Sequence, residues 1–217
     1  MPYDPRKDLA PVTLIAESAN VLLVGAGTPF NNVKELVAAA KQKPGVYTYA
    51  SSGNGSSLHV SGALLEKLAG VELLHIPYKG NAPALNDLYG GNVHMGFSST
   101  PVAIQSLKSG KAKLLGVTTK QRSKSLPHVP TLAEAGVQGY DFSNWYGLFA
   151  PGRTDPALLE QLAREVKKAL AKPEVQAAMA EQGVDPETNT PTEFKTRVHA
   201  ELARWERDVK TLKISNE

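Results

Sequence analysis

A run of serines and glycines, Ser51-Ser52-Gly53-Asn54-Gly55-Ser56-Ser57, joins a strand-like stretch to a helix-like one. Gly53 and Gly55 permit backbone angles that are closed to other residues, and Ser56 or Ser57 suits the N-cap of a helix. A helix that begins here directs free N–H groups and the positive end of its dipole into the run, among four hydroxyls. The pattern indicates a site for a carboxylate or phosphate oxygen that needs no formal positive charge. An ordinary capped turn is the alternative.

Known motifs argue against two kinds of site at this run, a nucleotide-binding loop and an acyl-transfer site. The Walker pattern of glycines followed by Lys and Ser/Thr is absent, and Leu58 occupies the place of the last glycine in G-x-G-x-x-G. The nucleophile elbow G-x-S-x-G is absent as well. The run therefore matches neither a nucleotide-binding loop nor an acyl-transfer site.

Histidines and cysteines bear on metal binding. His59 falls in the first turn of the expected helix, where a histidine either donates to a bound anion or caps and packs. The other four histidines lie on separate expected elements without the spacing of metal ligands: His75, His94, His128 and His199. The chain has no cysteine, which excludes disulfides and thiolate ligands. We expect neither a metal nor a cofactor.

Two further polar turns follow strands of the expected sheet. Tyr78-Lys79-Gly80-Asn81-Ala82-Pro83 offers free N–H groups and an amide, and Phe97-Ser98-Ser99-Thr100-Pro101 offers hydroxyls at the start of a helix. In a parallel sheet all three turns lie beyond the carboxyl ends of strands, where open α/β folds bind ligands. Their convergence is stronger support for a site than any single turn.

Two other groups of residues bear on the site. Trp145 is an aromatic candidate, because the polar Ser143 and Asn144 beside it favour a cleft; core filling is the alternative. Asp87 and Glu66 are single carboxylates and form no acid/base pair. The alternative function is a hydrolase or transferase that uses Ser56 or Ser57 with His59, and it requires an orienting carboxylate near His59.

Short strand-like and helix-like segments alternate in the first half of the chain. β-branched residues mark the strands, and an apolar spacing of three to four residues marks the helices. We expect strands at Val12–Ala16, Val21–Gly25, Val46–Ser51, Glu72–Ile76, Val93–Phe97 and Leu114–Thr118, and helices at Asn32–Lys43, Ser57–Leu68, Ala82–Leu88 and Val102–Leu107. This rhythm indicates βαβ units and a mainly parallel sheet covered on both faces.

The second half is loop-rich and then helical. A short helix is expected near Thr131–Ala135 and a long extended segment at Tyr140–Ala150. Helices are expected at Pro156–Ala171, at Glu174–Gln182 and after the capping box Thr190-Pro191-Thr192-Glu193. The last helix carries an apolar stripe with little strand material beside it: Phe194, Val198, Leu202, Trp205, Val209 and Leu212. We expect this stripe to dock on a segment preceding Met1 or on another chain.

Composition sets bounds on the class of protein. The chain has 217 residues, 41% of them hydrophobic, and 24 basic residues against 21 acidic ones give a net charge of +3. The basic residues of 108–124 have no interleaved aromatics, so nucleic-acid binding is not expected. No stretch approaches the ~20 apolar residues of a membrane span. The opening residues lack the apolar core of a signal peptide, so the protein is cytoplasmic or its natural start lies upstream.

Five patterns occur in order along nearly the whole chain. Tyr3–Val12 is similar to Y-D-P-x-K-D-F-x-P-V, with Leu9 at the place of F. The tract from Gly45 to His59 fits P-G-x-x-x-Y-x-S-x-G-x-G-S-x-x-H when Pro44 is included. Ile76–Ala84 matches V-P-Y-K-G-x-x-P-A, with Ile76 at the place of V. The remaining two are Leu126–Thr131 with Glu134–Gly136, and Trp145–Pro151. In these segments the chain resembles the periplasmic substrate-binding receptors of tripartite tricarboxylate transporters, often called Bug receptors.

The resemblance implies a fold and a division into lobes. It implies a periplasmic-binding-protein-like (type II) two-lobe α/β fold, with a complete second lobe at 19–145 that carries half of the ligand site. The first lobe, 1–18 with 146–217, is incomplete, because the N-terminal segment that forms one jaw in the family is missing here. The truncated chain would then bind little alone or would self-associate to cover its exposed helices.

The resemblance also implies a function. It is capture of a small carboxylate, such as a dicarboxylate or tricarboxylate, for delivery to the membrane components of a tripartite transporter, without chemistry. The location is the periplasm, with a signal peptide upstream of the sequence shown. The expected ligand-binding residues are Ser51, Ser52, Gly53, Gly55, Ser56, Ser57, His59, Tyr78, Gly80, Asn81, Ala82, Ser98, Ser99 and Trp145.

Overall fold

The computed structural model describes residues 3–212 and 214, which form two compact units. Unit 1 contains the described part of Met1–Glu17 with Trp145–Thr211, and unit 2 contains Ser18–Asn144 with the described part of Leu212–Glu217. The expected lobes include Met1, Pro2, Lys213 and 215–217, which lie outside the described residues. That unit 1 is an incomplete lobe stays a prediction.

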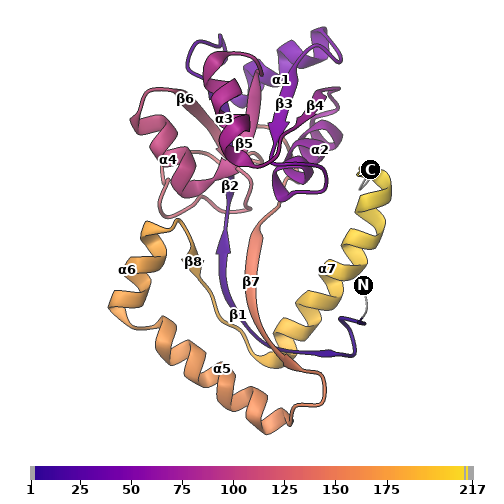
Figure 1. The fold of residues 1–217 in the computed structure, drawn as a ribbon, viewed down its shortest axis with the longest axis vertical. Coiled ribbons are helices and arrows are strands. Elements are labelled where there is room, and N and C mark those ends of the chain that lie inside the picture. Colours follow the sequence, from indigo (N-terminus) through magenta and orange to yellow (C-terminus); the bar gives the residue numbers. More distant parts are fainter. Residues whose placement is uncertain (1–2, 213, 215–217) are drawn as a thin grey trace. The chain divides into compact units, whose positions relative to one another are not determined.

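Unit 2 is built on a five-stranded sheet (Figure 1). Its strand order is β4 (Leu74–Pro77), β3 (Thr48–Ser51), β5 (Met95–Ser99), β2 (Asn20–Gly25) and β6 (Ala112–Val117). Strand β3 pairs in parallel with β4 and β5, whereas β2 is antiparallel to both of its neighbours, β5 and β6. The sheet is therefore mixed and not mainly parallel as expected: among its described strands β2 runs opposite to the other four, so two of the four pairings are antiparallel.

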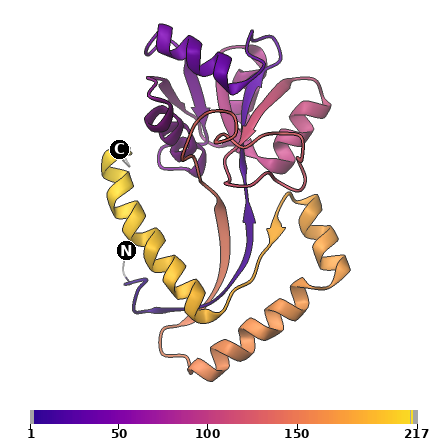
Figure 2. The same ribbon diagram turned by 180° about the vertical axis from the view of Figure 1, so that it is seen from behind.

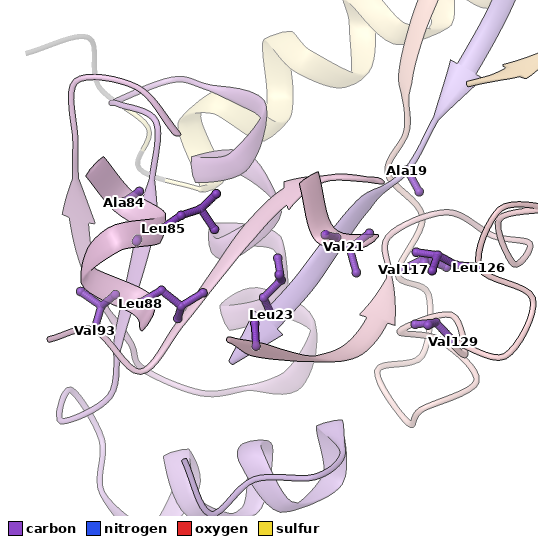
Figure 3. Packing of buried hydrophobic residues seen from close by; sticks show 13 residues of the cluster. Ala19, Val21, Leu23, Ala84, Leu85, Leu88, Val93, Val117, Leu126 and Val129 are labelled. Carbon is purple, nitrogen blue, oxygen red and sulfur yellow. The ribbon is translucent and has the colours of Figure 1, made fainter. Parts of the chain in front are cut away.

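Three helices pack on this sheet: α2 (Ser57–Ala69), α3 (Asn81–Gly90) and α4 (Thr100–Lys108). Helix α1 (Val33–Gln42) buries Val33, Leu36 and Ala40. Side chains alternate along a strand, so neighbours in β3 point to opposite faces. The ring of Tyr49 lies against Gly62 of α2, whereas Ala50 belongs to a core cluster with residues of α3 and α4. Figure 3 shows Val21 and Leu23 of β2 in that cluster. Both faces are thus covered, which accounts for the burial of every residue of β2.

The direction of the strands positions the three polar turns. Each of β3, β4 and β5 is followed directly by a helix, and these strands share one direction. Their carboxyl ends therefore lie along one edge of the sheet. Asn20, at the start of the antiparallel β2, pairs with Ser99 and so reaches the same edge.

Unit 1 combines a small sheet with three helices. Strand β1 (Leu9–Ser18) lies between β7 (Asn144–Pro151) and β8 (Asp185–Pro186). The helices are α5 (Pro156–Leu170), α6 (Pro173–Glu181) and α7 (Pro191–Thr211). Leu14 of β1 packs with Phe194 and Val198 of α7, with Trp145, Phe149 and Leu202 around them. Helix α5 buries only Ala163 among its residues.

One expected helix is wrong. Residues 118–143 run as successive turns (Figure 2), and Thr131–Ala135 forms a single turn with the N–H of Ala135 donating to the carbonyl of Thr131 at 2.9 Å. Gly136 follows at φ +110°, a conformation in which a helix cannot continue. Among the described helices, none has the length and apolar character needed to cross a bilayer.

Candidate functional site

The first polar turn, Ser51 to Ser57, is stabilised by hydrogen bonds of Ser51, whose side chain is fully buried. Its Oγ accepts the N–H of Gly53 at 3.2 Å and donates to the carbonyl of the same residue at 3.1 Å. It also lies 2.7 Å from Nε2 of His75. Gly53 and Gly55 have φ angles of +131° and +72°, which only glycine adopts without strain. The hydroxyl of Ser51 is therefore committed to shaping the turn.

A reciprocal cap joins the turn to α2. Ser56 is the N-cap, and its Oγ accepts the N–H of His59 at 3.2 Å. In return Nδ1 of His59 accepts the N–H of Gly55 at 3.1 Å. Because only an unprotonated Nδ1 can accept, His59 is neutral in this arrangement. The N–H groups of Ser57 and Leu58, in the first turn of α2, have no hydrogen-bond partner among the described residues.

Two histidine rings lie stacked beneath the turn. The rings of His59 and His75 are 3.8 Å apart and nearly parallel, and the ring of Tyr49 stacks on His75 at 4.8 Å. Burial lowers the pKa of His59, and burial together with the nearby His59 lowers the pKa of His75 to about 4. Both imidazoles are therefore uncharged at neutral pH.

The second turn is attached to the first by backbone hydrogen bonds. The N–H of Tyr78 donates to the carbonyl of Ser51 at 3.0 Å, and that of Gly80 donates to the carbonyl of Ser52 at 3.3 Å. The N–H groups of Asn81 and Ala82, in the first turn of α3, have no partner within residues 3–212 and 214. The first two turns thus present four free donors at the same edge of the sheet.

Asn81 connects the second turn to the third. Its Nδ2 donates to Oγ of Ser98 at 2.7 Å, and Ser98 is fully buried. Oδ1 of Asn81 is buried and has no hydrogen-bond partner in the described part of the chain, which is uncommon for a buried oxygen. Ser99, the N-cap of α4, is exposed and makes no side-chain cap bond. The structure therefore brings the three turns together.

Two expected site residues have their side chains committed elsewhere. The hydroxyl of Tyr78 donates to Asp87 at 2.6 Å, and burial with this bond raises the pKa of Tyr78 to about 12. Trp145 lies in unit 1, where its ring is 5.7 Å from that of Phe194. A ligand contact by Trp145 stays a prediction.

Sequence reasoning missed one residue at this edge, Asn20. It is 2% exposed, and its Nδ2 donates to Oγ of Ser61 on α2 at 3.0 Å while its Oδ1 accepts from Asn144 at 2.9 Å. The signal in the sequence that could have identified Asn20 is a polar residue at the start of an otherwise apolar strand. Asn20 holds the start of α2 against the sheet edge.

The charge of the site fits an anion held by dipoles. No expected site residue is a lysine, an arginine or a carboxylate, and Lys79, within the second turn, is exposed. Two helix N-termini with free N–H groups supply partial positive charge instead. Among the described residues there is no group of three or more His, Cys, Asp or Glu side chains placed to hold a metal ion.

The geometry does not favour the rival enzyme. Ser56 is engaged in the cap bond, and Nδ1 of His59, which a carboxylate would have to orient, accepts from Gly55. No carboxylate in the described part of the chain is hydrogen-bonded to His59. The serine nucleophile that the rival would activate through His59 is therefore not assembled here.

Comparison with known proteins gives a consistent family. Residues 1–214 match the model of the tripartite tricarboxylate transporter family receptor, TctC. A protein from the tcbD-tcbE intergenic region of Pseudomonas sp. (strain P51) is 38% identical over 208 residues, which are 95% of this chain and 62% of that protein. The chain thus spans less than two thirds of the length of this relative.

Solved structures agree with that family. An R. palustris protein with adipate aligns with a TM-score of 0.83 and 37% identity, covering 99% of this chain and 72% of that one. MatC from Rhodopseudomonas palustris with bound malate aligns with a TM-score of 0.76 and 30% identity, covering 94% and 70%. These likenesses bear out the periplasmic-binding-protein-like α/β fold, and the family is one of receptors and not of enzymes. The chain belongs to the tripartite tricarboxylate transporter receptor family.

Proposed function

We propose that this chain binds a small carboxylate at the three turns of unit 2 and serves as the receptor of a tripartite tricarboxylate transporter. The receptor works in the periplasm and delivers its ligand to the membrane components of the transporter. The cycle involves binding and release without a chemical reaction.

One observation carries the proposal. Four backbone N–H groups that have no hydrogen-bond partner among the described residues lie in the first turns of α2 and α3 at one edge of the sheet: those of Ser57, Leu58, Asn81 and Ala82. Donors of this kind suit the oxygens of a carboxylate, and no charged side chain among the expected site residues competes for them. The hydroxyls of Ser52 and Ser57 in the first polar turn, and that of Ser99 in the third, supply further contacts.

The remaining expected residues have positioning roles in this proposal. Ser51, Ser56 and Ser98 are committed to internal hydrogen bonds, and the two glycines of the first turn supply its backbone angles. Unit 2 is the lobe that carries these groups. The adipate and malate of the two related structures suggest that a dicarboxylate is the first class of ligand to test.

Calorimetric titration of this chain with malate, adipate and citrate, with chloride as the control anion, tests the proposal. Ser57→Pro is the decisive variant, because it removes one free N–H at a helix position that proline favours. The extended ψ of 158° at Ser56 accepts a following proline. A hydrogen bond to a charged group contributes about 1.5–3 kcal/mol, so we expect affinity to fall by about tenfold or more with the melting temperature unchanged.

Ser57→Ala is the matched control, because it removes the hydroxyl and keeps the N–H. It should lower affinity less than Ser57→Pro does. Absence of binding for every carboxylate, or full affinity in Ser57→Pro, would contradict the proposed function.

A further inference from the structure

The cap of α2 differs from three other capping boxes in the described part of the chain. In a capping box, an N-cap side chain accepts the N–H of the third helical residue, whose side chain accepts an N–H near the cap. Asn32 and Glu35 form one at α1, Thr131 and Glu134 form one at the turn after β6, and Thr190 and Glu193 form one at α7. In all three the second acceptor is a glutamate.

At α2 the same position holds His59. Oγ of Ser56 accepts the N–H of His59, and Nδ1 of His59 accepts the N–H of Gly55. The α1 cap has the same topology, since Glu35 accepts the N–H of Asn31, the residue before the N-cap. Histidine thus supplies the acceptor that glutamate supplies elsewhere, but without a charge.

A glutamate would otherwise be the better capping residue at this position. Its negative charge favours the N-terminus of a helix, and the other three boxes use it. The free N–H groups of Ser57 and Leu58 lie within the same turn of α2. A carboxylate at position 59 would occupy the positive end of the helix, which a bound anion needs, or would repel that anion.

The surroundings of His59 are consistent with exclusion of negative charge. Its ring contacts His75 of β4 and lies 6.3 Å from Tyr49 of β3, and both are neutral groups. Tyr140, fully buried against α2, donates to the carbonyl of Ser61. Glu66, two turns further along α2, accepts the N–H of Leu73 at 2.8 Å, and burial raises its pKa.

We propose that His59 is a positioning residue that completes the cap of α2 with an uncharged acceptor and so keeps negative charge out of the carboxylate site. This inference rests on the proposed function. It assigns His59 to holding Gly55 and the first turn of α2 through Nδ1, rather than to contacting the ligand.

The test compares His59→Glu with His59→Gln by calorimetric titration with malate and adipate. Both side chains complete a capping box, but only glutamate adds a charge. At pH 8 we expect His59→Glu to bind about tenfold more weakly than His59→Gln, with melting temperatures alike. Glu35→Gln in the cap of α1 is the matched control and should leave affinity unchanged.

Ser56→Asp and Ser56→Asn provide a second pair, in case glutamate at position 59 prevents folding. Aspartate and asparagine are equally good N-caps, so the aspartate variant should fold and should bind more weakly than the asparagine variant. Equal affinities within both pairs would overturn the inference. The inference would also be overturned if His59→Gln lost as much affinity and stability as His59→Ala does. That result would assign His59 to ring stacking. If the unaltered chain binds no carboxylate, the proposed function fails first, and this inference fails with it.

Discussion

At the scale of single residues, the neutral histidines beneath the first turn are the most consequential feature. His59 accepts from Gly55, and His75 contacts Ser51, so the two rings hold the end and the start of the same turn. Stacked at 3.8 Å, they cannot both carry a charge without strong repulsion. The shape of the turn is thereby linked to their protonation.

This link predicts a loss of stability in acid. The pKa of His75 is lowered from 6.5 to about 4 in the folded chain, so between these values the unfolded chain binds more protons. The stabilisation is complete above pH 6.5 and is lost as the pH falls toward 4. We expect a decrease in the free energy of unfolding of about 1–2 kcal/mol from this residue, discounted because the ring is only half-buried.

Urea unfolding of the chain and of His75→Gln between pH 7.5 and pH 4.5 measures this effect. The variant should show a flatter dependence on pH, whereas His128→Gln, at an exposed position, should follow the unaltered chain. Parallel curves for the chain and His75→Gln would refute the link.

At the scale of elements, α2 must approach β3 closely for the turn between them to form. The helix places Gly62 over the ring of Tyr49, and a Cβ added there would lie 2.1 Å from a ring carbon. Tyr49 is 1% exposed, so its ring has no room to move aside. The glycine is required by packing, since its φ angle is that of an ordinary helical residue.

Gly62→Ala should therefore destabilise the chain by about 1–3 kcal/mol or more through overpacking. The matched control is Gly90→Ala at the end of α3, where an added Cβ meets no atom closer than 3.7 Å. That change should be neutral or should stabilise by about 0.4–1 kcal/mol. Thermal unfolding followed by circular dichroism measures both, and equal effects of the two substitutions would contradict the packing argument.

The elements were largely predictable from the sequence, because apolar spacing reports local periodicity. The turn from Ser51 to Ser57 and the helix after it were expected where the structure has them. The antiparallel direction of β2 was not predictable, since the apolar run Val21–Val24 carries no sign of strand direction. Nor was the role of Asn20, whose partners Ser61 and Asn144 are far away in sequence. Such long-range pairing follows from topology rather than from local pattern.

At the scale of the whole molecule, the two units have separate hydrophobic clusters. Unit 2 contains the three turns, and unit 1 contains the aromatic cluster of Trp145, Phe149 and Phe194. The family match spans residues 1–214, and the Pseudomonas relative is longer than this chain. The central claim therefore concerns what unit 2 contributes to carboxylate binding.

Titration of the ¹⁵N-labelled chain with malate or adipate, followed by amide chemical shifts, tests that claim most directly. Binding should move the resonances of Ser57, Leu58, Asn81 and Ala82 most strongly, in a saturable way, because these N–H groups are the proposed donors. Smaller shifts should follow at the neighbouring residues of the three turns. Saturable shifts confined to α5, α6 or α7, with these four amides unmoved, would contradict the account.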